Sequence, residues 1–247
     1  MDGSKDSNDM KEVPNTDGKT EVGNCLYSGK ELKDAATKLD LYFGPKTIND
    51  RTQCIEPSFR LLIGVTGSVA ASKLRLLVGE VRKVKTQKQI EIFVVATETA
   101  RFFFDDGNCQ DPFVIFRDVD QWGWGKINDP ILHIELKNWA DCMLIAPLDA
   151  NTMAKIAAGI CDNLLTSIVT AWDSEKPVLF APAMNTQMWN NRIVQRNLET
   201  IKEMYGWRQI GPISKMLACK ELGMGGMCEV ETICAVVAEI VDGAIIS

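Results

Sequence analysis

The stretch Phe59-Arg60-Leu61-Leu62-Ile63-Gly64-Val65, followed at once by Thr66-Gly67-Ser68-Val69-Ala70-Ala71-Ser72, decides the fold. Its first half is a short apolar run typical of a buried strand, and its second half is a turn of small residues that opens a helix. Small side chains let the backbone approach a ligand, and N–H groups at a helix start face an anion. Gly64 and Gly67 are three residues apart, so the G-x-G-x-x-G fingerprint of dinucleotide-binding proteins is absent. A mononucleotide fits the turn better, although βα turns of this kind also occur without a ligand.

The same sequence of apolar run, polar turn and helix recurs further along the chain. The later apolar runs are Ile90–Ala96, Trp139–Pro147 and Pro177–Ala181. Alternating strands and helices predict an α/β fold, a three-layer sandwich around a parallel sheet. The carboxyl ends of parallel strands share one edge of the sheet, where open α/β sheets bind ligands. We expect four polar turns at that edge: residues 66–68, 97, 148–152 and 182–185.

The composition is that of a mildly acidic globular chain. Of its 247 residues, 46% are hydrophobic and 24% are charged, and the formal net charge is −6. The charge argues against nucleic acid as a partner, and no apolar run approaches the roughly 20 residues of a membrane helix. We expect residues 1–57, which are rich in polar residues and glycine, to be a disordered N-terminal tail that can dock locally near its end, where the apolar residues of Leu39-Asp40-Leu41-Tyr42-Phe43 lie. Residues 58–247 are predicted to form one folded domain.

Eight cysteines and a single histidine limit the possible chemistry. No two cysteines form a C-x-x-C pair, so a metal site is not expected. With no signal peptide at the N-terminus, we expect reduced thiols and a cytoplasmic location. His133 is the unique imidazole for proton transfer near neutral pH. It lies in Ile131–Leu136, whose alternation predicts a strand with His133 and Glu135 on one polar face; a surface role fits that pattern equally well.

Two further stretches combine unusual residues at expected turns. Pro182-Ala183-Met184-Asn185-Thr186-Gln187-Met188-Trp189 follows a buried strand, and the Asn185 amide can donate and accept hydrogen bonds. Asn185 could bind a ligand or simply cap the helix that follows. Leu217–Met227 is glycine-rich and is predicted to be a mobile surface loop. Its Cys219 is exposed in this interpretation, as a functional group or as an idle thiol.

Three stretches together resemble one family: Gly64-Val65-Thr66-Gly67-Ser68-Val69-Ala70-Ala71, Ala146-Pro147-Leu148-Asp149-Ala150-Asn151-Thr152, and Pro182 to Trp189. They look like the homo-oligomeric flavin-containing cysteine decarboxylases, and the resemblance runs from about Phe59 to Ile240. It implies a flavodoxin-like (Rossmann-type) fold, an FMN cofactor and a homotrimer with active sites at subunit interfaces. Within the family, the chain is most similar to the eukaryotic enzymes that convert 4'-phosphopantothenoylcysteine to 4'-phosphopantetheine in coenzyme A biosynthesis.

The resemblance also implies a role for each matching residue. Residues that would bind FMN are Gly67, Ser68, Thr97, Asp149, Ala150, Asn151, Thr152 and Ala183. His133 would be the catalytic base, and Cys219 would donate a proton in the reductive half-reaction. Asn185 would grip the substrate carboxylate, with Met188 as its partner in substrate binding.

These residue types suit the implied chemistry. A cysteine carboxylate has no β-carbonyl, so loss of CO2 leaves a carbanion without an electron sink. Oxidation of the thiol-bearing carbon by a flavin creates a thioaldehyde, which is such a sink. His133 is suited to proton transfer near neutral pH, and Asn185 orients the carboxylate without adding a charge.

The chain departs from the family at two places. Lys220 stands where the family usually has glycine after the cysteine, and Gly223-Met224-Gly225-Gly226-Met227-Cys228-Glu229 replaces the usual Gly-x-Gly-Ala-Met-Ala-Glu. One alternative function is a non-catalytic FMN-binding regulator of a protein phosphatase; another is a decarboxylase of peptides that end in cysteine. Retention of His133, Asn185 and Cys219, and the lack of an acidic run, disfavour the regulator.

Overall fold

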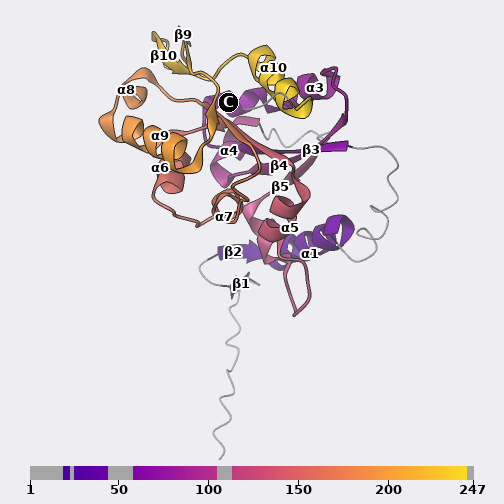
Figure 1. The fold of residues 1–247 in the computed structure, drawn as a ribbon. Helices are drawn as coiled ribbons and strands as arrows, with labels where there is room; N and C mark the ends of the chain where they lie inside the picture. The colour runs from indigo at the N-terminus through magenta and orange to yellow at the C-terminus, as the bar shows by residue number, and fades with distance from the viewer. Residues whose placement is uncertain (1–18, 23–24, 44–57, 105–112, 244–247) are drawn as a thin grey trace, which may run out of the picture.

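Six parallel strands form the central sheet of the computed structural model, which describes residues 19–22, 25–43, 58–104 and 113–243 (Figure 1). The strands are β3 (Ser58–Val65), β4 (Gln89–Ala96), β5 (Val114–Phe116), β6 (Cys142–Leu148), β7 (Val178–Pro182) and β8 (Arg208–Gln209). Their order is β5-β4-β3-β6-β7-β8, and every neighbouring pair is parallel. The predicted flavodoxin-like (Rossmann-type) sandwich is confirmed, with a strand order that grows outward from β3 in both directions.

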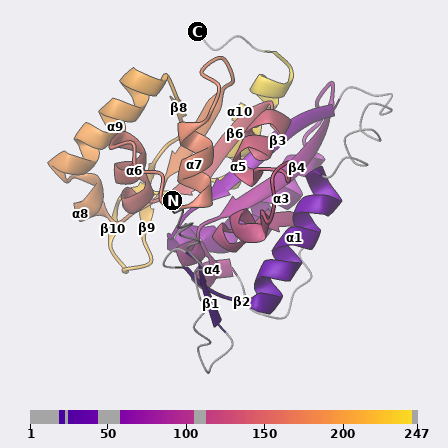
Figure 2. The ribbon, with the colours of Figure 1, turned by 90° about the horizontal axis from the view of Figure 1, so that it is seen from below.

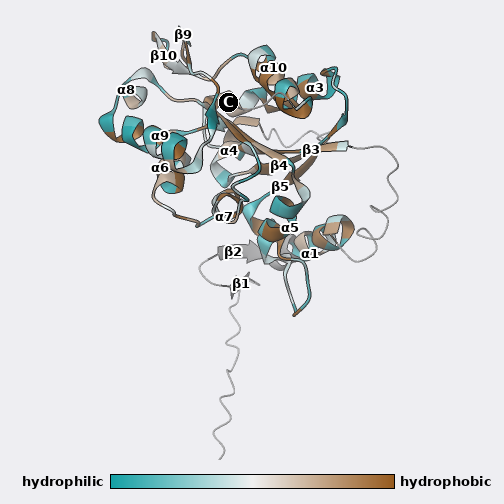
Figure 3. Cartoon of the chain, viewed as in Figure 1, coloured by the Kyte–Doolittle hydropathy of each residue, from teal (hydrophilic) through white to brown (hydrophobic). Residues whose placement is uncertain are grey.

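Helices cover both faces of this sheet. On one face lie η1 (Val69–Lys73), α3 (Leu74–Lys83), α4 (Glu98–Phe104) and α10 (Val230–Val241). On the other face lie α1 (Gly29–Phe43), α5 (Leu132–Trp139), α6 (Ala150–Ala157), α7 (Leu164–Thr170) and α9 (Arg192–Tyr205). Because successive strand residues point to opposite faces, Leu61 and Ile63 pack in the first layer and Leu62 in the second. Figure 3 shows the apolar strands between the two layers, with the polar sides of the helices outward.

The strand order reverses between β3 and β6, and this reversal positions the site. The chain leaves β3 toward η1 and α3, and it leaves β6 toward α6 on the opposite face. The two connections diverge at the carboxyl ends of the strands, so a crevice opens between them. Backbone hydrogen bonds join the carboxyl ends of β4, β3, β6 and β7 to one another. They run from Thr97 N to Val65 O (3.0 Å), from Thr66 N to Pro147 O (3.3 Å) and from Ala183 N to Leu148 O (3.0 Å). The predicted gathering of the polar turns at one edge is confirmed.

Part of the predicted tail forms helix α1. This helix, with β1 (Lys19–Val22) and β2 (Cys25–Ser28), precedes the sheet in the chain. Leu39 and Phe43 are buried, and Lys38 Nζ lies 2.6 Å from Asp120 Oδ2 and 4.7 Å from the centre of the Phe116 ring. These contacts dock α1 on η2 (Asp118–Gly123). The rest of the predicted tail, residues 1–18, 23–24 and 44–57, lies outside the described residues.

The predicted strand around His133 is also wrong, because these residues begin α5. Leu132, Leu136 and Trp139 are buried at positions i, i+4 and i+7, which is the spacing of one helix face. His133 and Glu135, two residues apart, therefore do not share a face as they would on a strand. Strand β6 starts only at Cys142, after this helix has ended.

The predicted glycine-rich loop is a β-hairpin. β9 (Ile213–Met216) pairs with β10 (Leu222–Gly226) antiparallel, with Leu222 opposite Met216. The helix expected after Asn185 is divided into α8 (Thr186–Trp189) and α9, which starts after the cap residue Asn191. Figures 1 and 2 both place β9 and β10 beside α8 and far from α1. Among the described helices, none is long and apolar enough to span a bilayer.

Candidate functional site

Thr66 joins the ends of β3 and β6. Its side chain is fully buried, and its Oγ1 donates to Pro147 O (2.8 Å) and accepts from Asp149 N (2.7 Å). A hydroxyl can do both at once, whereas an apolar side chain of the same shape can do neither. Thr66 therefore fixes the turn of β3 against the turn of β6. It was part of the predicted phosphate-binding turn, but nothing in the sequence indicated this bridging contact.

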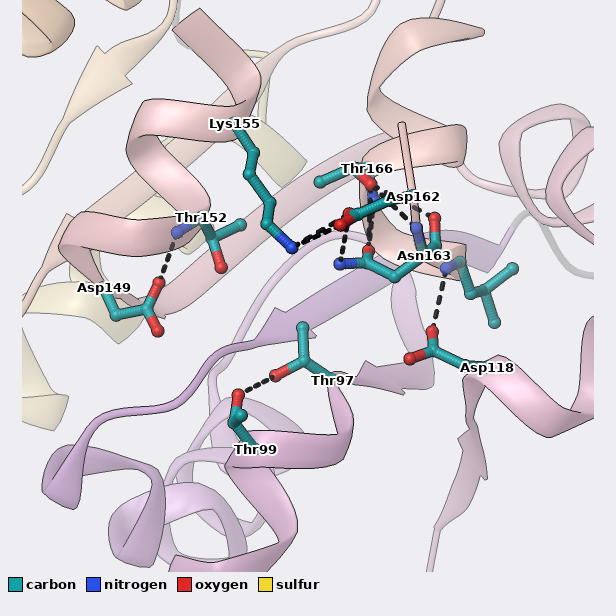
Figure 4. A network of polar contacts seen from close by, with 10 residues as sticks. Thr97, Thr99, Asp118, Asp149, Thr152, Lys155, Asp162, Asn163 and Thr166 are labelled. Atoms are coloured by element: carbon teal, nitrogen blue, oxygen red, sulfur yellow. Dashed lines mark hydrogen bonds and ion pairs between the residues drawn. The ribbon is translucent and has the colours of Figure 1, made fainter. Parts of the chain in front are cut away.

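Gly67 lies between the turns that follow β4 and β6. A Cβ atom at this position would lie 2.6 Å from Thr99 Oγ1 and 3.1 Å from Asp149 Oδ2. Thr97 Oγ1 is 3.2 Å from Thr99 Oγ1, so the two hydroxyls are tied to each other (Figure 4). Only glycine lets three turns approach this closely. The predicted FMN residues Gly67, Thr97 and Asp149 are thus brought together.

The start of α6 supplies the other predicted cofactor residues from this edge. Asp149 is the N-cap of the helix, with its Oδ1 accepting from Thr152 N (2.7 Å), as Figure 4 shows. Ala150, Asn151 and Thr152 form the first turn, and Thr152 is buried. The predicted polar loop is thus shorter than expected, because the helix begins at Ala150. The cap makes the position of Asp149 rigid.

Asn185 caps α8 at the end of β7. Its Oδ1 accepts from Met188 N (2.9 Å), so the capping interpretation is correct for the oxygen. The amide nitrogen then points away from the helix with two donors. Gly225, at φ +130°, would place a Cβ 2.5 Å from Met184 O, and its own carbonyl accepts from Met184 N (2.9 Å). The hairpin is therefore pressed onto the backbone that carries Asn185.

A cavity of about 380 Å³ lies between η1, the end of β7 and the hairpin. Its lining includes Ser68, Ala183, Asn185 and Cys219, which come from three separate stretches of the sequence. Most of its other lining atoms are apolar, contributed by residues such as Val69 and Met227. An apolar cavity with a few converging polar groups is the usual form of a small-molecule site.

Cys219 lies at the turn of the hairpin and is exposed. Its Sγ is 3.8 Å from Glu221 Oε2, within range of a weak S–H hydrogen bond to the carboxylate. The next residue, Lys220, has φ +65°, a conformation that favours glycine. The usual family glycine at this position therefore has a conformational reason, and this chain places a side chain there instead.

His133 and Met188 are not among the residues that line the cavity. His133 lies in the first turn of α5, on the sheet face opposite η1, and is half-buried. Burial lowers the pKa of its imidazole below the ordinary value. Met188 is on α8 with 47% of its surface exposed. Within one chain, the predicted base and the predicted carboxylate-binding amide are not brought together.

A carboxylate and two ammonium groups border the cavity. Glu229 Oε2 is 3.0 Å from Lys73 Nζ, and Glu229 Oε1 is 3.1 Å from Lys215 Nζ. Hydrogen bonds from Lys73 and then Lys215 hold the pKa of the Glu229 carboxyl below its usual value. Lys73 and Lys215 line the cavity, and Glu229 stands behind them. The sequence did not indicate this group, because its members are 142 and 14 residues apart in the chain.

The residues of this edge fit a flavin mononucleotide. Ser68, next to Gly67 in the chain, lines the cavity, and Thr97 and Thr99 place hydroxyls that could donate to a phosphate at the same edge of the sheet. The Asp149 carboxylate accepts hydrogen bonds, which suits ribityl hydroxyls better than a phosphate. The apolar cavity beside them suits a flat ring system. Among the described residues, no cluster of His, Cys, Asp and Glu could hold a metal ion.

Known proteins with this fold and these motifs were then compared with the chain. The profile of the flavoprotein family matches residues 50–242. The phosphopantothenoylcysteine decarboxylase of Mus musculus is 48% identical over 188 residues, which cover 76% of this chain and 89% of the mouse protein.

Two solved structures share the fold and much of the sequence. One is a Cys-to-Ser variant of PPC decarboxylase complexed with pantothenoylaminoethenethiol, with 43% identity, a TM-score of 0.69 and coverage of 74% of this chain and 98% of that chain. The other is the FMN-binding protein AtHal3, with 43% identity, a TM-score of 0.67 and coverage of 74% and 97%. Because the family profile covers residues 50–242, which include all six strands of the sheet and the turns at its carboxyl edge, the chain belongs to the flavoprotein family.

Proposed function

We propose that this protein is an FMN-dependent decarboxylase that converts 4'-phosphopantothenoylcysteine to 4'-phosphopantetheine in coenzyme A biosynthesis. The observation that carries the proposal is the cavity that unites Ser68, Ala183, Asn185 and Cys219. Two relatives support it: the mouse phosphopantothenoylcysteine decarboxylase, 48% identical over 188 residues, and the PPC decarboxylase variant complexed with pantothenoylaminoethenethiol, 43% identical over 74% of this chain. We also propose a cytoplasmic location, where coenzyme A precursors are made.

Gly67, Ser68, Thr97, Asp149, Ala150, Asn151, Thr152 and Ala183 would hold FMN. When bound, FMN supplies the two-electron oxidation of the thiol-bearing carbon, and it returns the electrons after CO2 has left. The chain itself supplies the groups that bind, orient and exchange protons.

Asn185 orients the substrate carboxylate through its amide nitrogen. Its oxygen is occupied by Met188 N, so the two N–H donors are fixed in direction. Asn185→Asp keeps an oxygen to cap α8 and replaces the donors with a negative charge. We expect this variant to fold normally and to lose at least about tenfold in kcat/KM, because a charged hydrogen bond becomes a repulsion.

His133 accepts the proton that leaves the substrate, and it must be neutral to do so. Its pKa is lowered by burial, so the neutral form persists below the ordinary 6.5 of imidazole. The acid limb of the pH–rate profile is therefore expected below 6.5. His133→Asn should abolish CO2 release while the protein stays yellow, and full activity in this variant would exclude the assignment.

Cys219 gives a proton to the product in the reductive step. Cys219→Ser should still release CO2 but accumulate the unsaturated enethiol. Mass spectrometry of the product distinguishes the enethiol from the thiol by two hydrogen masses. Normal thiol product from the variant would contradict the role of Cys219.

His133 would reach the cavity of a neighbouring copy in a homotrimer with interfacial active sites. The separation of α5 from the cavity within one chain supports this arrangement. A mixture of His133→Asn and Asn185→Asp chains tests it, since each alone is inactive. Sites shared between chains should regain roughly a quarter of wild-type activity in a random mixture. A mixture that stays inactive would place both residues in the same chain's site.

The central test combines cofactor and substrate. The purified protein should carry FMN, seen by its absorbance, and should release CO2 from 4'-phosphopantothenoylcysteine. Bound FMN without CO2 release from that substrate would contradict the proposed function.

A further inference from the structure

Two lysines are the charged residues that line the cavity. Lys73 comes from the end of η1, and Lys215 comes from β9 on the opposite wall. No aspartate or glutamate is among the described lining residues. In a chain of net charge −6, this cavity is a local concentration of positive charge. It therefore attracts an anion.

Both ammonium groups are held in place by one carboxylate. Lys73 and Lys215 contact different oxygens of Glu229, and Lys215 also donates to Met227 O (2.7 Å). Because the two cations outnumber this anion, the group keeps a net positive charge. Two ammonium groups that share one carboxylate are also close enough to share the oxygens of one phosphate.

Space for Lys215 depends on a residue that departs from the usual family sequence. A Cβ atom at Gly226 would lie 2.6 Å from Lys215 Cε and 2.7 Å from Lys215 Cγ. Alanine, which the family usually has here, would displace this stem. Gly226 thus lets the lysine lie flat along β10 with its ammonium group at the cavity.

We infer that Lys73 and Lys215 form a phosphate-monoester subsite in this cavity, positioned by Glu229, which binds the terminal phosphate of the substrate. The inference rests on the proposed function and assigns its specificity for the phosphorylated substrate. The cavity lies on the hairpin side of η1, whereas Thr97, Asp149 and Thr152 lie outside its lining. Of the hydroxyls proposed for the FMN phosphate, that of Ser68 belongs to the described lining, whereas those of Thr97 and Thr99 lie outside it.

The test compares 4'-phosphopantothenoylcysteine with pantothenoylcysteine, which lacks only the phosphate. Wild-type protein should prefer the phosphorylated compound by at least about tenfold in kcat/KM, because each charge-assisted hydrogen bond contributes on that scale. Lys73→Met and Lys215→Met keep the apolar stems and should reduce the preference about tenfold, mainly through KM. Lys73→Arg and Lys215→Arg should retain it. Lys83→Met, which removes a comparable ion pair with Glu80 on α3, should leave the preference intact.

Several outcomes would overturn the subsite. The subsite is excluded if both Met variants keep the wild-type preference for the phosphorylated compound. It is also excluded if wild-type protein uses the two compounds equally well, although CO2 release would then still support the proposed function. If the Met variants lose bound FMN but keep the preference for the phosphorylated substrate, the lysines bind the phosphate of the cofactor instead. If neither compound releases CO2, the proposed function fails. Titration calorimetry then compares the affinities of wild-type protein for 4'-phosphopantetheine and pantetheine. Tighter binding of the phosphorylated compound would support the subsite, and equal affinities would exclude it.

Discussion

The turns at the carboxyl edge of the sheet and the β9–β10 hairpin build the same site with opposite physical properties. At the sheet edge, Thr66 and Gly67 are held by buried hydrogen bonds between strands that are covered on both faces. The hairpin is two-stranded, exposes Met216 and Leu222, and has Lys220 in the left-handed region. The edge is suited to holding a cofactor in one position. The hairpin, with fewer buried contacts, is suited to moving when a substrate enters or leaves.

The largest expected effect comes from filling the gap at Gly67. Gly67→Ala places a methyl group 2.6 Å from Thr99 Oγ1 and 2.9 Å from Thr99 Cβ, so the turns must separate. We expect a loss of about 1–3 kcal/mol in unfolding free energy and at least a tenfold weaker affinity for FMN. Chemical denaturation and flavin titration measure the two effects.

Gly79→Ala is the matched control for this change. Gly79 lies inside α3, and a Cβ there would meet no atom within 4 Å. Alanine should stabilise the helix by about 0.4–1 kcal/mol without affecting FMN. If Gly67→Ala behaved like Gly79→Ala, close packing of the three turns would not be needed for the cofactor.

The next effect in size tests the hydroxyl bridge at Thr66. Thr66→Val preserves the shape but leaves Asp149 N without its acceptor and removes one of the two donors to Pro147 O, which keeps the bond from the backbone N–H of residue 66. Unsatisfied buried groups of this kind cost about 1–3 kcal/mol. Thr86→Val, which removes an exposed hydroxyl contact to Lys88 O, should cost less than about 0.5 kcal/mol. Equal costs for the two variants would mean that the edge is no more rigid than the surface.

The edge could be predicted from the sequence because its determinants are local. Apolar runs such as Ile90–Ala96 indicate buried strands, and small residues such as Gly67 indicate close approach. Parallel pairing then brings the turns together without further information. Family resemblance adds the names of the residues that bind there.

Features set by tertiary contacts could not be predicted. In the six residues around His133, polar and apolar side chains alternate as on a strand. The helical spacing of the buried residues becomes visible only in a longer segment that includes Trp139. The glycines of β10 suggested a loop, although Gly225 and Gly226 serve close approaches to Met184 and Lys215. Helix α1 docks through the buried side chains of Leu39 and Phe43, where the sequence indicates local docking, and through Lys38 reaching Asp120, which lies 82 residues away and could not be foreseen.

A smaller effect is expected from the half-buried carboxyl of Asp118 beside the edge. Its Oδ1 accepts from Leu164 N (2.8 Å), the first N–H of α7, beside the N-cap residue Asn163 (Figure 4). Burial raises its pKa above 3.8, so the ionised form destabilises the fold at neutral pH. Asp118→Asn keeps an acceptor without the charge and should be more stable than wild type at pH 7. That advantage should vanish as the pH falls below 3.8, where both folded and unfolded wild type are protonated.

Asp118→Ala separates this hydrogen bond from the charge. Both variants lack the carboxylate, so their difference in unfolding free energy reports the hydrogen bond to Leu164 N alone, about 1 kcal/mol. Denaturation of wild type and both variants at pH 7 and at pH 3.5 provides the six values needed. A stability of Asp118→Asn below wild type at pH 7 would show that the charge itself is required.

The smallest effect is expected in the hairpin. Lys220→Gly relieves a left-handed conformation, which costs a non-glycine residue about 1 kcal/mol, but glycine also loses more entropy on folding. We expect the free energy of local opening of the hairpin to rise by a few tenths of a kcal/mol, while the free energy of global unfolding changes little. Hydrogen exchange of Leu217 N, which donates to Glu221 O (2.9 Å), measures this locally. Asn128→Gly, at φ +80° in a separate turn, is the control, since asparagine tolerates this conformation better than lysine. A larger gain at Asn128 than at Lys220 would mean that the hairpin turn already relaxes its strain by moving, in keeping with a mobile wall opposite a fixed cofactor edge.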